Sequence, residues 1–219
     1  MCGILGWIGE GAAESVARER SRHSLEALRP RGPDGMRLEH GPDWTLGHTR
    51  LAILDLSENG AQPMRDEQGR WLVFNGEIYN FQELRAELEQ AGCTFRSTGD
   101  AEVLLQALGH WGVAVLPRLR GMFAFGWLDP ERRELILARD RYGVKPLTWE
   151  ATPDGLRFAS DLFALDALAG GTASRSIDEE AVWRYLLLGH VPAPATIWQG
   201  VRKLLPGHCL KMNWGAAGG

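Results

Sequence analysis

The chain has 219 residues, of which 44% are hydrophobic and 24% charged, a balance typical of a globular protein with one sizeable core. Its formal net charge of -4, with acids and bases interspersed, excludes a basic stripe for nucleic acid and a polybasic membrane patch. No apolar run reaches the roughly 18 residues of a membrane-spanning helix, and the three distant cysteines form neither a disulfide framework nor a zinc cluster. We therefore expect a cytoplasmic protein with small-molecule partners, no metal site, no nucleic acid and no membrane.

The first part of the chain predicts strands and one surface helix. Residues 2–9 resemble a buried strand that glycines end, and residues 14–28 space apolar residues among charges as a surface helix does. Two further strands, 36–40 and 44–54, are separated by Gly41-Pro42-Asp43. This turn signal predicts a hairpin.

The middle of the chain predicts a strand followed by two helices. The strand over 71–80 leads into a helix over 81–92, which Asn80 is placed to cap and Gly92 to stop. A second helix over 98–108 has Asp100 near its start.

The last part predicts two hairpins and then a mixed segment. Strands 121–128 and 134–140 flank an Asp-Pro turn, and 148–160 form a hairpin around Pro153-Asp154-Gly155. There follow a short helix, a glycine-rich break over 169–174, a helix over 178–188 and a last strand within 201–214. Locally paired strands with helices inserted in groups indicate a layered α+β domain rather than a steady βαβ alternation.

Cys2 directly follows the initiator methionine. Removal of Met1, which the small cysteine side chain permits, would leave a thiol and a free α-amine on one residue. An α-amine has a pKa of about 7.7 to 8.0, so it can take the thiol proton near neutral pH and return it to a leaving amine. Cys2 is therefore a candidate nucleophile, and the alternative is an ordinary apolar residue of a buried strand.

Asn75, Gly76 and Glu77 place a side-chain amide, a flexible backbone N–H and a carboxylate consecutively at a strand end. Acyl transfer through a tetrahedral intermediate needs two donors that face the developing oxygen anion, and the Asn75 side chain with the Gly76 N–H can supply them. The alternative is an ordinary Asn-Gly turn, although apolar residues on both sides favour burial over a hairpin tip.

Arg50 follows a strand pattern and can form a two-point contact with a substrate carboxylate, while Glu77 or Asp100 can hold a substrate ammonium group. One arginine with acidic residues is what a free amino acid requires. Each of these charges can instead belong to a structural ion pair. His48 is the histidine nearest to the proposed site, and we favour a core or supporting role for it, because an α-amine makes a histidine base unnecessary.

Eight short motifs follow one another along the chain: M-C-G-I-L-G, R-G-P-D-G, H-T-R-L-A-I-L-D, Q-P-M, N-G-E-I-Y-N, T-G-D-A-E-V, G-M-F-A-F and R-D-R-Y-G-V-K-P-L. In this order the chain resembles the glutaminase domain of asparagine synthetases, from Met1 to about Trp214. The resemblance implies a class II glutamine amidotransferase, with the α+β fold of N-terminal-nucleophile hydrolases, a four-layer αββα sandwich.

By the same resemblance, Cys2 is the nucleophile, and Asn75 and Gly76 form the oxyanion hole. Arg50 binds the glutamine carboxylate, and Glu77 and Asp100 contact its amino end. Four further residues line the glutamine pocket with their backbone: Leu51, Ala52, Ile53 and Leu54. The expected reaction is hydrolysis of L-glutamine to glutamate and ammonia, with no metal and no cofactor in this chain.

Asparagine synthetases continue into a synthetase domain with an S-G-G-x-D-S loop that binds ATP, and these 219 residues contain no such motif. The stretch A-G-G-T-A-S-R-S at 169–176 lacks the aspartate and is interpreted as a loop. We therefore expect a glutaminase domain over 1–214, a linker-like tail over 215–219 and no synthetase domain, so that ATP and magnesium serve only the missing domain. The expected partners are L-glutamine and a synthetase domain or subunit that accepts ammonia, and a homodimer is left open.

Two alternatives also stay open. One is the glutaminase of another class II amidotransferase that feeds sugar-phosphate or phosphoribosyl chemistry, although the R-D-R-Y-G-V-K-P-L and G-V-R-K-L-L-P-G-H stretches favour the synthetase branch. The other is a non-catalytic module that keeps the glutamine pocket without turnover.

Overall fold

The computed structural model describes residues 1–153, 155–173 and 175–215. The tip of one expected hairpin at Asp154, Ser174 of the expected glycine-rich loop and residues 216–219 of the expected tail lie outside the described residues. The described chain forms two antiparallel sheets. In spatial order the first sheet consists of β10 (Val201–Lys203), β8 (Thr148–Thr152), β9 (Gly155–Ala159), β1 (Gly3–Gly9), β3 (Trp44–Arg50) and β2 (Gly35–His40). The second consists of β11 (Cys209–Asn213), β7 (Glu134–Arg139), β6 (Gly121–Asp129), β5 (Trp71–Ile78) and β4 (Met64–Arg65).

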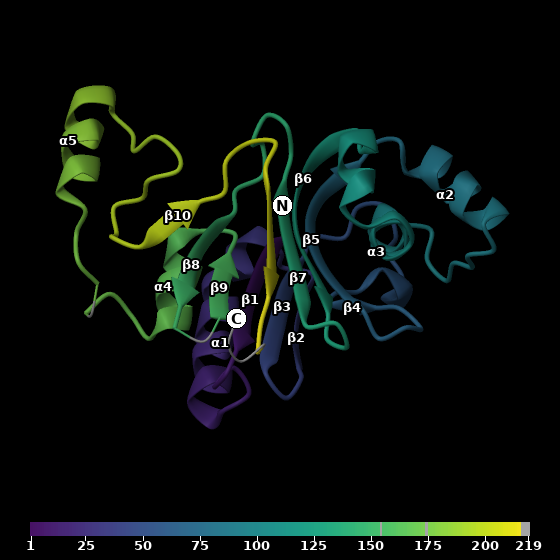
Figure 1. The fold of residues 1–219 in the computed structure, drawn as a ribbon, viewed down its shortest axis with the longest axis horizontal. Coiled ribbons are helices and arrows are strands. Elements are labelled where there is room, and N and C mark those ends of the chain that lie inside the picture. Colours follow the sequence, from purple (N-terminus) through teal and green to yellow (C-terminus); the bar gives the residue numbers. More distant parts are fainter. Residues whose placement is uncertain (154, 174, 216–219) are drawn as a thin grey trace.

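Helices cover the outer face of each sheet (Figure 1). The first sheet is covered by α1 (Ser15–Ala27) and α4 (Leu162–Ala169), and the second by α2 (Phe81–Gln90) and α3 (Asp100–Trp111). A fifth helix is α5 (Glu179–Leu188), and short 3-10 turns span Arg29–Arg31, Glu58–Gly60 and Gly112–Arg118. The layers are therefore helix, sheet, sheet and helix, which confirms the expected αββα sandwich.

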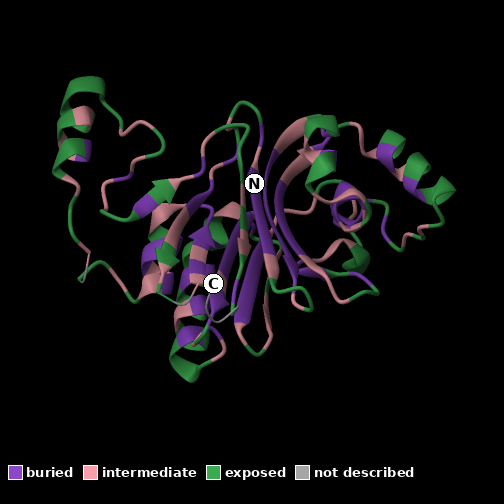
Figure 2. Ribbon diagram, viewed as in Figure 1, coloured by how far each residue is buried: buried purple, intermediate pink, exposed green. Residues whose placement is uncertain are grey.

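Three apolar clusters hold these layers together, as the buried residues along the sheets and inner helix faces show (Figure 2). The central cluster lies between the two sheets and includes Ile4, Val73 and Phe158. Each large apolar side chain buried in this way contributes about 1.5–3 kcal/mol to folding. The sandwich thereby fixes the ends of β1, β3 and β5 relative to one another.

Strand β3 is shorter than expected, because it ends at Arg50 and not at residue 54. Beyond it, the N–H of Leu51 donates to Cys2 Sγ (3.4 Å) and that of Ala52 to Asp34 Oδ2 (2.9 Å). Peptide donors that bond to distant side chains are not available to a strand ladder. Residues 51–54 therefore form a loop.

The expected last strand is two strands in different sheets. β10 pairs with β8 in the first sheet, and β11 pairs with β7 in the second. Between them lie Pro206, which has no N–H, and Gly207, whose φ of 69° favours glycine. The chain leaves one sheet here and enters the other.

Asn80 occupies the predicted N-cap position of α2, but its side chain does not cap the helix. Its Nδ2 donates to Arg118 O (3.1 Å), and its Oδ1 accepts the N–H of Arg120 (2.9 Å). The capping prediction was therefore wrong, because the side chain bonds to the segment before β6. Gly92, with φ of 91°, follows the end of α2 as predicted.

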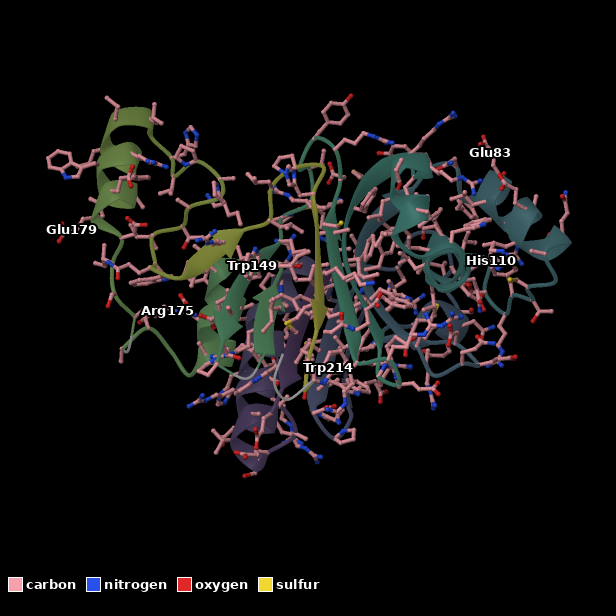
Figure 3. All side chains as sticks on the ribbon, in the orientation of Figure 1. Glu83, His110, Trp149, Arg175, Glu179 and Trp214 are labelled. Carbon is pink, nitrogen blue, oxygen red and sulfur yellow. The ribbon has the colours of Figure 1, made fainter. Side chains whose placement is uncertain are left out.

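Helix α5 stands apart from the sandwich, and its residue Glu179 lies at the opposite end of the molecule from Glu83 on α2 (Figures 1 and 3). Ala181 is the one buried residue described in this helix, whereas Trp183 is 72% and Leu187 82% exposed. Arg175 joins the segment before α5 to the sandwich through ion pairs with Glu150 (2.8 Å) and Asp166. None of the helices in the described ranges is long and apolar enough to cross a membrane.

Candidate active site

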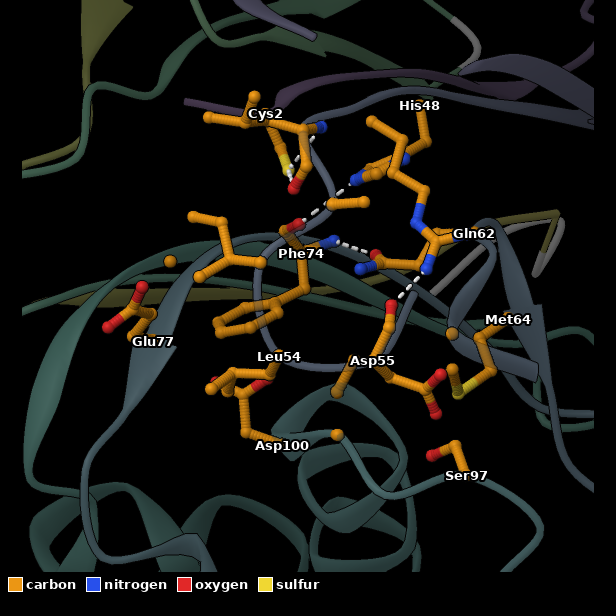
Figure 4. Close-up of a pocket in the computed structure, with 18 residues that line it drawn as sticks. Cys2, His48, Leu54, Asp55, Gln62, Met64, Phe74, Glu77, Ser97 and Asp100 are labelled. Atoms are coloured by element: carbon orange, nitrogen blue, oxygen red, sulfur yellow. Dashed lines mark hydrogen bonds between the residues drawn. The ribbon is translucent and has the colours of Figure 1, made fainter. Parts of the chain in front are cut away.

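A cavity opens where the start of β1, the end of β3, strand β5 and the start of α3 meet (Figure 4). Of the ten predicted site residues, nine line it: Cys2, Arg50, Leu51, Ala52, Ile53, Leu54, Gly76, Glu77 and Asp100. The tenth, Asn75, immediately precedes Gly76 in β5. The fold thus brings together residues from four separate parts of the sequence.

Cys2 lies at the cavity wall against the peptide of Leu51. Its Sγ is 3.4 Å from the Leu51 N and 3.7 Å from the Leu51 O, so the thiol can donate to the carbonyl and the thiolate can accept from the N–H. Burial raises the pKa of the thiol, and the Leu51 N–H, the terminal amino group, Lys145 and Arg50 act in the opposite direction. Met1 precedes Cys2 here, so the Cys2 nitrogen belongs to a peptide bond.

Arg31 holds the backbone of this cysteine. Its Nε donates to Cys2 O (3.2 Å), and its Nη1 lies 3.8 Å from Asp161 Oδ2. Sequence reasoning assigned Arg31 no role, although it opens the R-G-P-D-G motif. A single basic residue in a loop has no spacing from which such a contact could be predicted.

The loop after β3 forms one wall of the cavity and is tied to Arg50. The guanidinium donates to Ser57 O (3.0 Å) and to Asp55 O, which leaves further N–H groups for a ligand. Hydrogen bonds from Ser57 and Thr98 lower the pKa of the Asp55 carboxyl to about 2. This anion therefore links the loop to the segment before α3 at any ordinary pH.

Strand β5 presents a free edge to the cavity. Among the described residues, β4 pairs with β5 only at Leu72 and Trp71, and no other strand lies on that side of the residues beyond them. The N–H of Phe74 donates to Gln62 Oε1 (2.7 Å), and that of Ile78 donates to Asp100 Oδ2 (2.8 Å). Because peptide groups alternate between the two edges of a strand, the Gly76 N–H faces the same edge.

Asn75 and Gly76 have the features of an anion-stabilising pair. Asn75 is 1% exposed, and its Nδ2 has no hydrogen-bond partner in the described part of the chain. Its side chain shares a face of β5 with Val73, which packs toward the sheet that contains β1. Gly76 lies so close to β6 that a Cβ would clash with the carbonyl of Met122.

Two acids lie at the other end of the cavity. Burial raises the pKa of the Asp100 carboxyl to about 6, and the nearby charge of Glu77 acts in the same direction. Asp100 begins α3, and one of its oxygens is bonded to the Ile78 N–H. A cation that reached this end would find two carboxylates beside it.

Two further residues of the wall, His48 and Gln62, are not among the ten predicted site residues. His48, which was expected to have a core or supporting role, is 1% exposed, and its Nε2 lies 3.2 Å from Phe74 O. Gln62 belongs to the Q-P-M motif, but a lone amide in a loop gave no reason to assign it a function. Burial lowers the pKa of His48 to about 3, so the ring is neutral near neutral pH.

The cavity combines a thiol, an arginine, two carboxylates and the Gly76 peptide of β5, with the Asn75 amide next to it in the strand. Over the described residues, no cluster of three or more His, Cys, Asp or Glu side chains is arranged to hold a metal ion. This set of groups suits nucleophilic attack on a carbonyl of an amino acid, with hydrogen bonds to the resulting oxygen anion. The roles of the individual residues stay predictions.

Comparison with known proteins shows which family the chain belongs to. A family model described as a glutamine amidotransferase domain matches residues 1–218. A putative glutamine-hydrolysing asparagine synthetase of Mycobacterium tuberculosis is 40% identical over 229 residues, which cover 94% of this chain and 34% of the relative. Asparagine synthetase 1 of Bacillus subtilis is 37% identical, with 94% of this chain and 33% of the relative covered. The chain thus spans about a third of the length of these relatives.

Solved structures share the fold. The allosteric regulatory enzyme of purine biosynthesis matches with a TM-score of 0.68 and 22% identity, over 97% of this chain and 47% of that one. The glutamine phosphoribosylpyrophosphate amidotransferase of Bacillus subtilis matches with a TM-score of 0.61 and 22% identity, over 77% and 44%. With a family match along almost its whole length, the chain belongs to the glutamine amidotransferase domain family.

Proposed function

We propose that the chain hydrolyses L-glutamine to glutamate and ammonia with Cys2 as the nucleophile, as the ammonia-supplying part of an asparagine synthetase-like amidotransferase. The observation that carries this proposal is the single cavity that joins the Cys2 thiol, the Arg50 guanidinium, the free edge of β5 and the Asp100 carboxylate. A free amino acid has a carboxylate for Arg50 and an ammonium for the acids, so its side-chain amide extends toward the thiol.

In the proposed reaction, the Cys2 thiolate attacks the side-chain carbonyl carbon of glutamine. The carbonyl oxygen becomes an anion, which the Asn75 Nδ2 and the Gly76 N–H stabilise. The C–N bond then breaks, the nitrogen takes a proton and leaves as ammonia, and a γ-glutamyl thioester remains. Water hydrolyses the thioester to glutamate and restores the thiol. The Cys2 α-amine transfers the protons, which requires removal of Met1.

The ammonia acceptor belongs to the proposal as well. The relatives named asparagine synthetases are about three times as long as the region matched, which supports a synthetase domain or subunit as partner. ATP and magnesium would act there, and we assign no cofactor to this chain. The three free cysteines and the mixed surface charge support a cytoplasmic location.

The test is an incubation of the 219-residue chain, freed of Met1, with glutamine, aspartate, ATP and magnesium. We expect glutamate and ammonia in equal amounts, independent of ATP, and no asparagine. ATP-dependent asparagine would contradict the assignment of synthesis to a separate partner. A chain that binds an electrophilic glutamine analogue without covalent labelling of Cys2 would instead be a non-catalytic module.

We expect Arg50→Lys to raise KM for glutamine with a smaller change in kcat. An ammonium cannot reproduce the planar two-point contact with a carboxylate, and a hydrogen bond to a charged group contributes about 1.5–3 kcal/mol, or roughly ten- to a hundredfold. Steady-state kinetics measure the effect. Arg37→Lys, on the neighbouring strand β2 and paired with Glu58, is the matched control and should leave KM unchanged. An equal KM for glutamine in both variants would show that Arg50 has a structural role and does not bind the substrate.

The raised pKa of Asp100 predicts an acid limb in kcat/KM. The carboxylate attracts the substrate ammonium only when ionised, so kcat/KM should fall as the pH decreases through about 6. Asp100→Asn should weaken glutamine binding and remove this inflection. A wild-type inflection that persists in Asp100→Asn would assign it to another group.

The raised pKa of Asp100 also predicts an effect on stability. Here the protonated carboxyl favours the folded state, whereas substrate binding needs the ionised one. Because the folded-state value lies above the ordinary value of 3.8, the stability that proton binding to Asp100 supplies is complete below about pH 4 and is lost as the pH rises through about 6. Asp100→Asn should therefore raise the melting temperature at neutral pH and leave it unchanged near pH 4. Thermal melts across this range measure the difference.

A further inference from the structure

Phe74 directly precedes Asn75 in β5, and both its N–H and its C=O bond to side chains instead of to a neighbouring strand. Phe74 N–H donates to Gln62 Oε1 (2.7 Å), and Phe74 O accepts from His48 Nε2 (3.2 Å). Because a carbonyl can only accept, Nε2 carries the ring proton. We call Gln62, His48 and the Phe74 peptide groups the Phe74 clamp.

The clamp supplies the hydrogen bonds that a neighbouring strand would otherwise make to this part of β5. β6 pairs with β5 along its whole length, but on the other edge β4 ends at the level of Leu72. At this edge the two Phe74 peptide groups and the Ile78 N–H are therefore bonded by side chains, and the Gly76 N–H between them is left for a ligand. His48 comes from β3 in the opposite sheet and Gln62 from the loop before β4, so the clamp also joins the two sheets beneath the cavity.

The two side chains of the clamp are almost fully buried, so neither can exchange its bond to Phe74 for a bond to water. His48 is 1% and Gln62 7% exposed, and both line the cavity. An unsatisfied buried peptide group costs about 1–3 kcal/mol, so each partner keeps Phe74 in one position. Neither side chain carries a charge near neutral pH, since His48 stays neutral. Because the imidazole is neutral, it does not repel the nearby charge of Arg50.

We infer that Gln62 and His48 are positioning residues that act through Phe74 to direct the Asn75 amide and the Gly76 N–H at the oxyanion. This inference rests on the proposed function, in which those two groups stabilise the tetrahedral intermediate. A peptide shift at Phe74 moves Asn75 and Gly76 directly, because they are the next two residues of the strand. Hydrogen-bond donors must be held within about 0.5 Å of their productive position to stabilise a transition state.

The test compares Gln62→Met in the wild type and in Asn75→Ala. Methionine is close to glutamine in size but offers no good acceptor to the Phe74 N–H. We expect Gln62→Met to lower kcat by about tenfold or more, with KM within about twofold, because a donor used in the transition state is misplaced. In the Asn75→Ala background the further loss should be smaller, because one of the two misplaced donors is already absent and only the Gly76 N–H is left to be moved.

His48 supplies a second, independent arm. His48→Gln keeps an N–H donor near the position of Nε2, whereas His48→Leu removes it. We expect His48→Gln to retain at least about tenfold more kcat than His48→Leu. This pair keeps the inference testable even where Gln62→Met does not fold.

Thr196→Val is the control for a general loss of stability. Thr196 is 1% exposed and its hydroxyl donates to Val201 O (3.0 Å), away from the cavity. This variant should lower the melting temperature without changing kcat. A second readout is the exchange rate of the Phe74 amide proton, which should rise in Gln62→Met and not in Thr196→Val.

The outcomes separate the inference from the function on which it rests. If Asn75→Ala lowers kcat while Gln62→Met reduces it by the same factor in both backgrounds, the clamp is overturned and the proposed function stands. Equal kcat in His48→Gln and His48→Leu would also overturn it. If Asn75→Ala leaves kcat unchanged, the oxyanion assignment itself fails, and the clamp fails with it.

Discussion

Cys2→Ala should lose glutaminase activity almost completely, with kcat lower by about 10⁴-fold or more, on the scale seen when a catalytic nucleophile is removed. Without the sulfur no thioester can form, and water would have to attack the amide directly. The substitution removes one atom at the rim of the cavity, so we expect the free energy of unfolding to change by about 1 kcal/mol or less. Glutamate release and a thermal melt measure the two effects.

Cys209→Ala is the matched control, because Cys209 is an exposed thiol on β11 and does not line the cavity. It should retain full activity and lose none of the labelling by an electrophilic glutamine analogue. Material that still carries Met1 should behave like Cys2→Ala in turnover, since its α-amine is not on Cys2. Glutamate release by Cys2→Ala at a rate near that of the wild type would refute the mechanism.

Asn75→Ala should lower kcat by about 10² to 10³, with a smaller effect on KM, because its amide is used mainly in the transition state. The unpartnered Nδ2 supports this expectation, since a buried donor without a partner costs free energy unless a ligand satisfies it. Steady-state kinetics with glutamine measure kcat and KM separately.

Asn80→Ala provides the comparison for Asn75→Ala. Asn80 lies just beyond the same strand, but its amide bonds to Arg118 and Arg120 and not to the cavity. This variant should lower stability while kcat stays within about twofold of the wild type. A change in KM alone for Asn75→Ala would move its role from the transition state to the binding of substrate.

Most of the helices and strands could be predicted because their signals are local. The hairpin of β2 and β3, the strand-to-helix passage from β5 to α2 and the start of α3 near Asp100 follow from turn residues and from the spacing of apolar residues. The layered fold then followed from the order of elements and from the family resemblance. Strands that pair with their neighbours in sequence leave few alternative arrangements.

The parts that were missed depend on contacts across the sequence. β3 stops at Arg50 because the next two peptide N–H groups bond to side chains elsewhere in the chain. Leu51 bonds to Cys2, 49 residues away, and Ala52 bonds to Asp34, 18 residues away. Gln62 bonds to a strand that begins nine residues later, and no periodic pattern announces it. Nine of the ten residues that the motifs predicted line one cavity, yet the hydrogen bonds that support them are visible only in three dimensions.

Helix α5 is stabilised mainly by its own ends. Asp178 Oδ1 accepts the N–H of Ala181 (3.1 Å), and Gly189 ends the helix in a left-handed conformation. Helices shorter than about 12–15 residues are marginal in water without tertiary packing, and Trp183 and Leu187 are exposed instead of packed. We therefore expect α5 to open by local unfolding, independently of the sandwich.

Amide hydrogen exchange measures this opening directly. The amides of α5 should exchange before those of α1 to α4, and equal protection of α5 and the buried helix α3 would contradict the expectation. In a longer protein or a complex, exchange that slows in α5 alone would show that a partner surface covers Trp183 and Leu187. Such a partner must also supply the free energy that keeps this helix folded.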